Sequence, residues 1–401
     1  MECKKIFRAA DLATLDEYTI RHEPVAAIDL MERAALAFTT RLLELYPREP
    51  RFRVVAGTGN NGGDGFAVAR LLRERGREAL LYAVHASEHC SPCLDVNRER
   101  FLAAGGEVVE VRREEEFSPS GDGAWIDALF GTGLRRPVRG WLAGIIRRVN
   151  EAGGPVIAVD IPSGLAGEDN RENDGAITRA TWTLTFAFPK LAFMLEENYP
   201  YVGDFEVLDI GLHPAITRDH PSRFYYLTRE AVTRVLPARD KFARKGTRGR
   251  VLLVAGSTGM MGAALLATRG AIRSGAGLVT VHVPGAHARL VHATIPEALV
   301  DADTDDARFT GVTLTPPPDA IGVGPGLGVA AETGAGLWRL LEEWRGKLVL
   351  DADALNIVAR AGGVERLPAG CVLTPHAGEF DRLAGKSSSD FERLDKLINF
   401  A

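Results

Sequence analysis

Cysteine is scarce in this chain, with four residues in 401. Cys90 and Cys93 form a CxxC pair, but the chain has no second pair that could complete a zinc site. A redox dithiol is one interpretation, because the pair directly precedes a helix-like stretch. Surface thiols at a helix start are the commoner outcome for such a pair, and we adopt that interpretation.

Long apolar runs and an excess of positive charge are absent as well. No stretch is long enough to cross a membrane, and residues 1–8 lack the apolar core of a secretory signal. The formal net charge of -5 gives no reason to expect nucleic-acid binding. The chain is 46% hydrophobic and 25% charged, as in ordinary globular proteins, and its length suggests two domains. We therefore expect a cytoplasmic enzyme with no membrane partner.

The glycine-rich stretch at residues 57–65, Gly-Thr-Gly-Asn-Asn-Gly-Gly-Asp-Gly, carries the strongest local signal. It follows an apolar run at 52–56, which predicts a buried strand, and precedes residues 66–72, whose spacing predicts a helix. A glycine-rich turn at a helix N-terminus favours an anionic ligand. The stretch matches neither the dinucleotide fingerprint nor a Walker A loop, and a loop that held only phosphate would have little use for Asp64. We expect a binding site here rather than a capped tight turn.

Two further predicted strands end in carboxylates beside glycine loops, at Asp127 and at Asp160. Strand and helix patterns alternate through the first half of the chain, which predicts a parallel sheet with helices on both faces. Ligands of such sheets bind beyond the carboxyl ends of the strands. Three strands therefore bring carboxylates to one edge, where their repulsion calls for a cation or an altered protonation state. Amide, hydroxyl and carboxylate oxygens suit a hard cation.

The alternating pattern breaks between residues 208 and 236, and we place a domain boundary near residue 218. It restarts in the second half, where strands are predicted at 251–255, 278–283, 320–323, 347–350 and 371–374. His376 follows the last of these strands beside Gly378 and Glu379, which makes it a pocket candidate rather than a plain helix cap. The loop sequences differ from those of the first half, so we predict a second, unrelated α/β domain.

These motifs, in this order, resemble a known enzyme family. Residues 1 to about 215 resemble the NAD(P)H-hydrate epimerase domain, and residues 225–401 resemble the front part of the ADP-dependent NAD(P)H-hydrate dehydratase domain. The matching motifs of the first half are Asn-Asn-Gly-Gly-Asp-Gly at 60–65, Asp127 with Gly-Thr-Gly at 131–133, and Asp-Ile-Pro-Ser-Gly at 160–164. Those of the second half are Lys-Gly at 245–246, Gly-Arg at 249–250, Gly-Ala-Ala at 262–264, Ser-Gly-Ala-Gly-Leu-Val at 274–279, Pro-Glu at 296–297, Gly-Pro-Gly-Leu-Gly at 324–328, Asp-Ala-Asp-Ala-Leu-Asn at 351–356 and Pro-His-Ala-Gly-Glu at 375–379.

The resemblance implies an α/β fold in two parts: a Rossmann-like three-layer epimerase domain over residues 1–218, then an incomplete ribokinase-like domain over 219–401. It implies nicotinamide nucleotide repair by an isomerase and a lyase. The epimerase interconverts the R and S forms of NADH hydrate and NADPH hydrate, and the dehydratase removes water from the S form with ADP or ATP. The implied cofactors are potassium and ADP (or ATP), with Mg²⁺ as a further candidate, and a homo-oligomer is expected.

The resemblance also assigns residues to roles. Asp160 is the implied catalytic acid/base and also touches the hydrate. Potassium is held by Asn61, Asp127 and Ser163. The implied hydrate-binding residues of the first half are Asn60, Asn61, Gly62, Gly63, Asp64, Gly131, Thr132, Gly133, Leu134, Arg135, Arg136 and Pro137. Those of the second half are Ala263, Gly326 and His376.

One departure from the family pattern is visible. The family continues past the Pro-His-x-Gly-Glu motif to a Gly-Thr-Gly-Asp loop, which binds nucleotide phosphates and supplies a catalytic Asp, whereas this sequence ends at Ala401. The expectation is a dehydratase half without its nucleotide side. Three hypotheses stay open here: a bifunctional repair enzyme with a shortened chain, an epimerase with a residual second domain for binding or assembly, and a ribokinase-class kinase.

Overall fold

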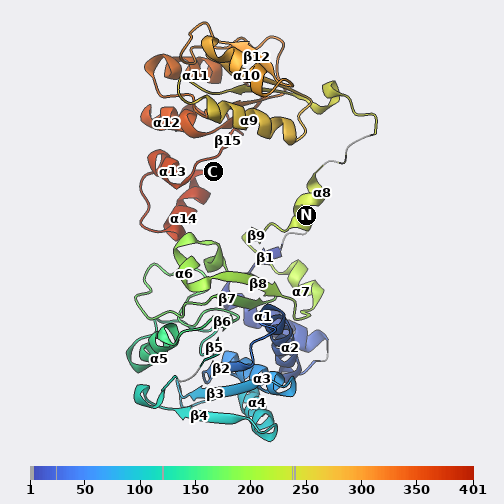
Figure 1. Ribbon diagram of the computed structural model, residues 1–401, viewed down its shortest axis with the longest axis vertical. Coiled ribbons are helices and arrows are strands. Elements are labelled where there is room, and N and C mark those ends of the chain that lie inside the picture. The colour runs from blue at the N-terminus through green and yellow to red at the C-terminus, as the bar shows by residue number, and fades with distance from the viewer. Residues whose placement is uncertain (1–3, 24, 120–121, 237, 239–240) are drawn as a thin grey trace. The chain divides into compact units, whose positions relative to one another are not determined.

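The computed structural model describes residues 4–23, 25–119, 122–236, 238 and 241–401. The chain divides into two compact units, one formed by Met1–Leu236 with Ser389–Leu394 and the other by Pro237–Ser388 with Asp395–Ala401 (Figure 1). Each unit contains its own parallel sheet, which confirms the predicted α/β class. The boundary expected near residue 218 falls within the short helix α7 (Pro214–Asp219).

A seven-stranded sheet forms the centre of the first unit, with the order β4-β3-β2-β5-β6-β7-β8 and every neighbouring pair parallel. The strands are β2 (Arg51–Ala56), β3 (Glu78–Val84), β4 (Glu107–Val111), β5 (Ala124–Ala128), β6 (Val156–Val159), β7 (Trp182–Phe186) and β8 (Asp204–Leu208). The predicted strand at 52–56 corresponds to β2, and Asp127 and Asp160 lie at the ends of β5 and β6 as expected. The sheet therefore follows from the apolar runs of the sequence.

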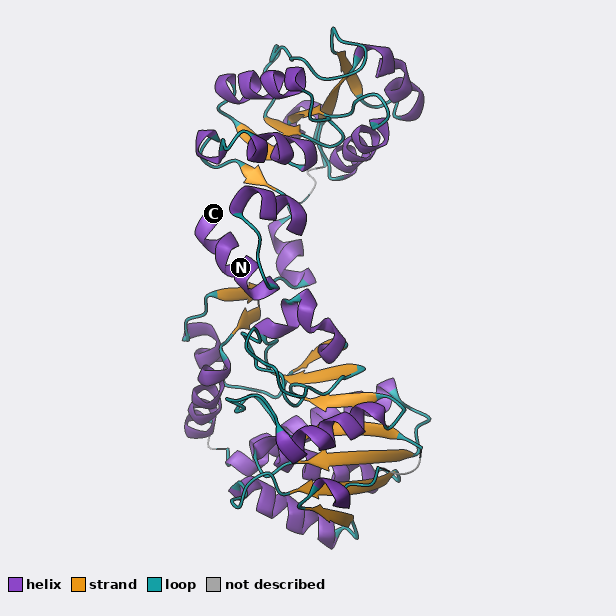
Figure 2. Cartoon of the chain, turned by 90° about the vertical axis from the view of Figure 1, so that its left-hand side faces the viewer, coloured by secondary structure: helices purple, strands orange, loops and turns teal. Residues whose placement is uncertain are grey.

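Helices cover both faces of this sheet, as Figure 2 shows for the lower group of strands. On one face α2 (Ala27–Leu45), α3 (Asn60–Glu74) and α4 (Pro92–Ala103) form a core with Val54 of β2. On the other face α5 (Gly140–Glu151) packs in a separate core with the next residue, Val55. Because successive side chains of a strand point to opposite faces, β2 contributes to both cores and is buried on both sides.

The strand order reverses between β2 and β5. From β2 the chain proceeds through β3 to β4 in one direction, and then returns to β5 and proceeds through β6 and β7 to β8 in the other. The loops that follow β2 and β5 therefore diverge and open a crevice at the carboxyl ends of these strands, which is where sheets of this kind bind ligands. Residues 60–64 follow β2, and residues 131–137 follow β5. The topology places both predicted binding segments at that crevice.

The prediction of a glycine turn up to Gly65 is wrong, because α3 already begins at Asn60. The first helical turns contain Gly62, Gly63 and Gly65, none of which has a positive φ. A Cβ at Gly62 would lie 2.0 Å from the carbonyl oxygen of Gly57, and one at Gly65 would lie 2.7 Å from the Cβ of Ala128. These glycines are therefore needed for close packing of the helix start against the sheet, and not for turn geometry.

Shorter elements complete the first unit. The strands β1 (Lys4–Ile6) and β9 (Phe224–Tyr226) form an antiparallel pair. The helix α8 (Arg229–Val235) begins after Thr228, whose hydroxyl caps it by accepting a hydrogen bond from Ala231 N at 3.2 Å. The remaining helical segments are α1 (Ala9–His22), η1 (Glu114–Glu116), η2 (Leu191–Met194), η3 (Glu196–Asn198) and α6 (Tyr199–Val202).

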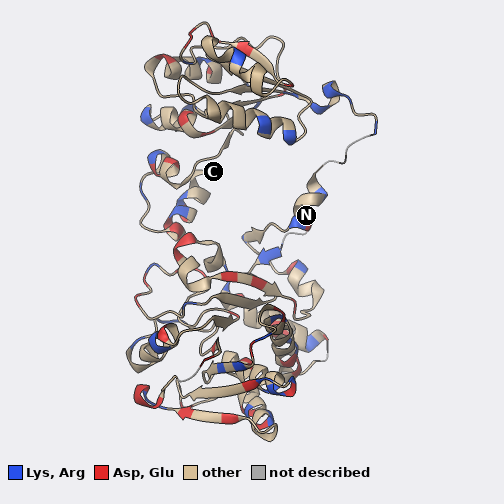
Figure 3. Cartoon of the chain, in the orientation of Figure 1, with Lys and Arg blue, Asp and Glu red and all other residues tan. Residues whose placement is uncertain are grey.

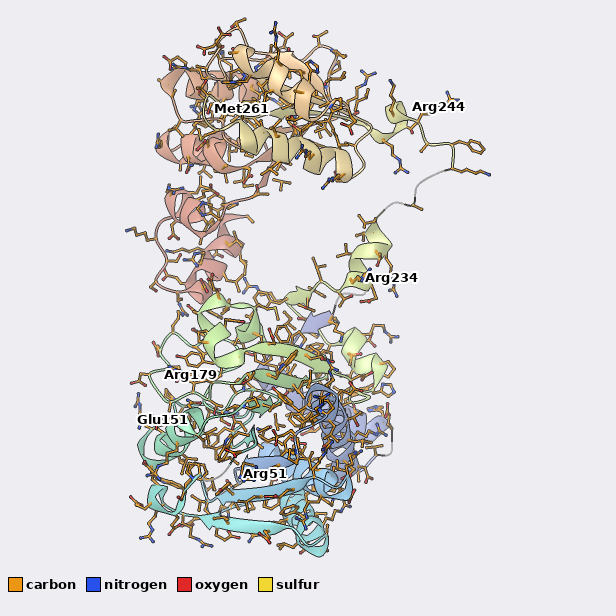
Figure 4. The ribbon with its side chains drawn as sticks, in the orientation of Figure 1. Arg51, Glu151, Arg179, Arg234, Arg244 and Met261 are labelled. Atoms are coloured by element: carbon orange, nitrogen blue, oxygen red, sulfur yellow. The ribbon has the colours of Figure 1, made fainter. Side chains whose placement is uncertain are left out.

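The second unit contains a six-stranded sheet with the order β12-β11-β10-β13-β14-β15, again parallel throughout. The strands are β10 (Arg250–Val254), β11 (Leu278–Val283), β12 (Leu299–Ala302), β13 (Ala320–Val323), β14 (Lys347–Leu350) and β15 (Val372–Leu373). The helical segments are η4 (Lys245–Arg248), α9 (Met261–Arg273), η5 (Gly285–His287), α10 (Ala288–Thr294), α11 (Ala331–Glu343), α12 (Ala352–Arg360), η6 (Val364–Arg366) and α13 (Ala377–Ala384). The helix α14 (Asp390–Phe400) has residues in both units, because its residues up to Leu394 belong to the first. Met261, which begins α9, is labelled in Figure 4.

Both signs of charge are mixed over each unit, as Figure 3 shows. This distribution accords with the formal net charge of -5. Among the described residues, no helix combines the length and the apolar character that a membrane span requires.

Candidate active site

Three predicted residues come together at the carboxyl edge of the first sheet: Asn61 of α3, Asp127 of β5 and Ser163 of the loop after β6. The backbone N–H of Ser163 donates to Asp127 Oδ2 at 2.7 Å, and its hydroxyl donates to Asp127 Oδ1 at 2.6 Å. The same hydroxyl accepts from Phe130 N at 2.7 Å, while Asn61 Nδ2 donates to Phe130 O at 2.9 Å. All three predicted residues are buried. The structure thus gathers the predicted cation set into one network.

The oxygens of this network suit a monovalent cation. An amide, a hydroxyl and the Phe130 carbonyl surround one carboxylate, Asp127, and hard cations prefer such oxygen ligands. Burial raises the pKa of Asp127, against the hydrogen bonds from Ser163 that lower it. Within the described residues no group of three or more His, Cys, Asp or Glu side chains could hold a metal. The residues present therefore fit a singly charged ion better than a transition metal.

Asp160 stands directly after β6 in a strained conformation. Its φ is 66°, in the left-handed region that residues other than glycine seldom adopt, and such strain is concentrated at functional sites. Its Oδ1 accepts hydrogen bonds from Lys190 Nζ at 2.5 Å, Thr185 Oγ1 at 3.0 Å and Phe186 N at 3.0 Å. The end of β7 and the loop that follows it therefore fix one oxygen of the carboxylate.

Two more carboxyls face Asp160. Burial first, and then the negative charge of Asp160, raise the pKa of Asp16 on α1 to about 6, although the Lys190 ammonium opposes the shift. Burial raises the pKa of Asp64 on α3 well above its usual range, and the charges of Asp160 and Asp16 add to the effect. A site with one buried cation and three nearby carboxyls can hold both an acid and a base at neutral pH.

Asp16 and Lys190 were missed by the sequence analysis. Asp16 lies in an amphipathic helix, where an acidic residue normally faces solvent, and nothing local distinguishes it. Lys190 could have been found, because residues 187–190 leave β7 at the same sheet edge as the other site loops. A lysine that is only 2% exposed at that edge is a functional candidate.

The loop after β5 lines a cavity of about 490 Å³ together with the segment after β6. The cavity is lined by the predicted residues Leu134, Arg135, Arg136 and Pro137 and by Gly164, Ala166, Asp169, Arg171, Glu172 and Asn173. Its three arginines suit phosphate groups, since guanidinium binds phosphate in a fixed fork geometry. Gly131 lies against Asn61: a Cβ built at Gly131 would be 3.1 Å from Asn61 Cβ. This loop thus connects the cation network with the cavity.

The CxxC pair lies next to α4. Ser91 caps that helix by accepting a hydrogen bond from Leu94 N at 3.3 Å, and Cys90 and Cys93 are free thiols. Burial, and then the charge of Asp64, raise the pKa of Cys93. A reactive thiol requires the opposite shift, so the geometry favours thiols without redox chemistry.

In the second unit, two of the three predicted hydrate-pocket residues lie in contact. Gly326 has a φ of 65°, and a Cβ built on it would lie 2.6 Å from Met260 O and 3.0 Å from Ala263 Cβ. His376 caps α13 by accepting from Gly378 N at 3.1 Å, and its Nε2 lies 3.2 Å from Glu379 Oε1. It follows β15, two strands from β13 in the sheet order. All three lie at the carboxyl edge, but no hydrogen bond among the described residues joins His376 to the other two.

Comparisons with known proteins agree with this division of the chain. The family described as YjeF-related protein N-terminus matches residues 27–192, and the NAD(P)H-hydrate dehydratase family matches residues 251–399. The bifunctional NAD(P)H-hydrate repair enzyme Nnr of Thermofilum pendens is 34% identical over 99% of this chain and 78% of its own length. The enzyme of the same name from Escherichia coli is 32% identical over 91% of this chain and 68% of its own length.

Two solved structures are also similar to parts of the chain. The ADP/ATP-dependent NAD(P)H-hydrate dehydratase of Bacillus subtilis, co-crystallised with ATP and Mg²⁺, is 32% identical over 43% of this chain and 60% of its own, with a TM-score of 0.34. A yeast protein is 19% identical over 57% of this chain and 98% of its own, with a TM-score of 0.46.

The fold defines a two-part α/β protein, with a candidate site at the carboxyl edge of the sheet in its first unit. The chain belongs to the bifunctional NAD(P)H-hydrate repair enzymes. It is an enzyme of nicotinamide nucleotide repair that combines an NAD(P)H-hydrate epimerase with an NAD(P)H-hydrate dehydratase. Because both family matches are present, this interpretation holds over an epimerase with a residual second domain and over a kinase.

Proposed function

We propose that the crevice of the first unit is the epimerase site and that Asp160 is its acid/base. The observation that carries this proposal is the geometry of Asp160: its backbone is strained, three donors converge on Oδ1, and no hydrogen bond from the described residues reaches Oδ2. A carboxylate fixed through one oxygen presents the other to a ligand. Residues 60–64 and 131–137 bind the hydrate on either side of the crevice.

The chemistry requires a group that exchanges a proton with an oxygen. A hydroxyl at C6 beside the ring nitrogen of the reduced nicotinamide forms a hemiaminal. When the hydroxyl is protonated, the nitrogen lone pair expels water and an iminium remains. Water then adds from the other face and loses a proton, which gives the opposite epimer. A positioned carboxyl can exchange these protons, with a typical gain of roughly 10²–10⁴-fold in rate.

We assign the cation site to potassium, held by Asn61, Asp127 and Ser163. Support comes from the single carboxylate in an otherwise neutral oxygen set and from the raised pKa of the buried Asp127. A bound potassium ion would compensate the Asp127 charge and hold the loops after β2, β5 and β6 at one point. It would therefore position the hydrate-binding loops rather than take part in proton exchange.

We assign the dehydratase to residues 219–401 and the epimerase to residues 1–218. The family matches at 27–192 and 251–399 fall on either side of this boundary. The hydrate pocket of the second unit is lined by Ala263, Gly326 and His376. Its co-substrate is ADP or ATP, and Mg²⁺ is a further cofactor. Any side chain at position 326 would be strained at its positive φ and would clash with Met260. The glycine therefore leaves the pocket wall open at that point.

Exchange between the purified epimers tests the epimerase assignment. One epimer of NADH hydrate is incubated with the protein, and the other is followed by chromatography after subtraction of the uncatalysed rate. The expected result is rapid exchange that Asp160→Asn lowers by about 10²–10⁴-fold. Exchange at the parent rate in a folded Asp160→Asn variant would refute the assignment.

A further inference from the structure

Lys190 is a buried ammonium for which the family assignment gives no role. It is 2% exposed, and lysine is seldom fully buried unless it has a partner. Its Nζ lies 2.5 Å from Asp160 Oδ1 and 2.7 Å from Thr185 Oγ1, with the carbonyl oxygens of Phe188 at 3.3 Å and Phe186 at 3.5 Å. The ammonium is thus surrounded by acceptors, and Asp160 is its one anionic partner among the described residues.

The backbone around Lys190 is fixed on several sides. Ala187 has a φ of 58°, so the loop between β7 and Lys190 is strained, as Asp160 itself is. Phe188 packs in one apolar cluster with Phe7 and with Leu15 of α1. This cluster holds α1, and with it Asp16, beside the loop that carries Lys190. The lysine therefore reaches Asp160 from a rigid position.

The charged groups that face Asp160 come from three elements. They are Lys190 from the loop after β7, Asp16 from α1 and Asp64 from α3. Burial and mutual repulsion raise the pKa of both Asp16 and Asp64, which favours their protonated forms. Only Asp160 accepts a hydrogen bond from the ammonium. One cation among three carboxyls thus selects which of them carries the negative charge.

We propose that Lys190 is a positioning residue for epimerisation, which holds Asp160 as a carboxylate and directs its Oδ2 toward the hydrate. In this arrangement the acid/base role given to Asp160 above is divided: Asp160 is the base, and the buried Asp64 at the start of α3 supplies the proton. The proposal rests on the epimerase assignment given above. Hydrogen bonds from Thr185 and Phe186 hold the same oxygen, but they are neutral and cannot compensate its charge. The ammonium alone does both.

Every proton and electron pair is accounted for in this arrangement. Asp64 gives its proton to the C6 oxygen, the C6–O bond breaks with its electron pair on oxygen, and the ring nitrogen lone pair forms the C=N bond of the iminium. Water then forms a new C6–O bond from the other face as the C=N electron pair returns to nitrogen. Its proton passes to Oδ2 of Asp160. Transfer of one proton from Asp160 to Asp64 restores the starting state.

Removal of the Lys190 charge should change the pH dependence of the reaction as well as its rate. Without the ammonium, Asp160 lies near two carboxyls and has no cationic partner among the described residues, so its negative charge is no longer compensated. In Lys190→Met we expect the acid limb of the kcat/KM profile for epimer exchange to move up by roughly one to two pH units, as typical for an opposite charge at this distance. At neutral pH the rate should fall by about tenfold or more.

Thr185→Val is the matched control. It removes a neutral donor to the same Asp160 oxygen and nearly preserves the side-chain shape, so it should lower the rate with a smaller movement of the acid limb than Lys190→Met. Lys190→Arg keeps the charge and should keep the limb near its parent position. Lys190→Gln, which also removes the charge, replaces Lys190→Met if that variant does not fold.

Asp160→Asn is measured in parallel to separate the two proposals. If Asp160→Asn is inactive and the neutral Lys190 variants show the upward movement, the inference is supported. If Asp160→Asn is inactive but the neutral variants lose rate equally at every pH, the inference is overturned and the epimerase assignment stands. If Asp160→Asn keeps the parent rate, both are overturned.

Discussion

Ser163 binds both oxygens of Asp127, with its backbone N–H on one at 2.7 Å and its hydroxyl on the other at 2.6 Å. This pair connects the loop after β6 to β5 through a buried carboxylate. The same hydroxyl accepts from Phe130 N, so the chain is also held where it enters the loop at 131–137. A serine in the loop after β6 thus orders the loop after the neighbouring strand, β5.

Loss of the Ser163 hydroxyl should weaken this connection. Ser163→Ala removes a hydrogen bond to a buried charged group, which typically costs about 1.5–3 kcal/mol of unfolding free energy. Hydrogen exchange of peptides from β5 and β6, followed by mass spectrometry, measures the opening of the first unit alone. Ser222→Ala is the control, because that hydroxyl donates to a neutral carbonyl, Ile6 O, at 2.7 Å. Equal losses in the two variants would contradict the account.

Potassium should stabilise the same network. With a bound cation the Asp127 charge is compensated, so the opening free energy of β5 and the rate of epimer exchange should both rise when potassium replaces tetramethylammonium at equal ionic strength. Asp127→Asn should abolish the difference, because its side chain has no charge to compensate. A parent protein that responds equally to both cations would indicate that the three side chains form a hydrogen-bond network only.

Asp16 should make the first unit less stable as pH rises. Its folded-state pKa is raised to about 6, so the folded protein keeps a proton that the unfolded chain releases near 3.8. Stability therefore falls as pH rises from about 4 to 6, and the full penalty is present above that window. Asp16→Asn should match the parent at pH 4 and exceed it at pH 7 by on the order of 2 kcal/mol, measured by hydrogen exchange. A difference that does not change with pH would exclude this origin.

Two glycine-to-alanine changes should have opposite signs. In Gly65→Ala the new Cβ would lie 2.7 Å from Ala128 Cβ, so overpacking by about 1–3 kcal/mol should exceed the gain in helix propensity. At Gly270 in α9 an added Cβ would meet no neighbouring group within 4 Å, so Gly270→Ala should stabilise the second unit by roughly 0.5–1 kcal/mol. Hydrogen exchange of each unit measures the two effects. Stabilisation by Gly65→Ala would show that the helix start can relax.

The sheets could be predicted from the sequence because their strands are continuous apolar runs. β11, β13 and β14 have the predicted bounds, because each is a short apolar run that can be recognised without information on its partner strands. The pairing of β1 with β9 could not be predicted. Those strands have three residues each and lie more than 200 positions apart, so the pairing depends on tertiary contacts.

The start of α3 was mispredicted for a different physical reason. Three glycines in four residues have poor helix propensity, which favours a turn, but close contact with Gly57, Met31 and Ala128 requires them inside the helix. Lys190 and Asp16 were missed because they matter through their burial and their interaction with Asp160 in the folded chain. No local sequence motif indicates either property. The structure brings together Asn61, Asp127 and Ser163 as predicted. This could be predicted because the position of a ligand site beyond the carboxyl ends of parallel strands depends only on strand order.

The rate of epimer exchange in Asp160→Asn tests the account most directly. Asp204→Asn is the matched control, because Asp204 is an exposed aspartate at the start of β8. Both variants are assayed with one purified epimer of NADH hydrate, and hydrogen exchange of β5 and β6 establishes that both are folded. The account predicts the parent rate in Asp204→Asn and a loss of about 10²–10⁴-fold in Asp160→Asn. A folded Asp160→Asn variant that exchanges the epimers as fast as Asp204→Asn would contradict it.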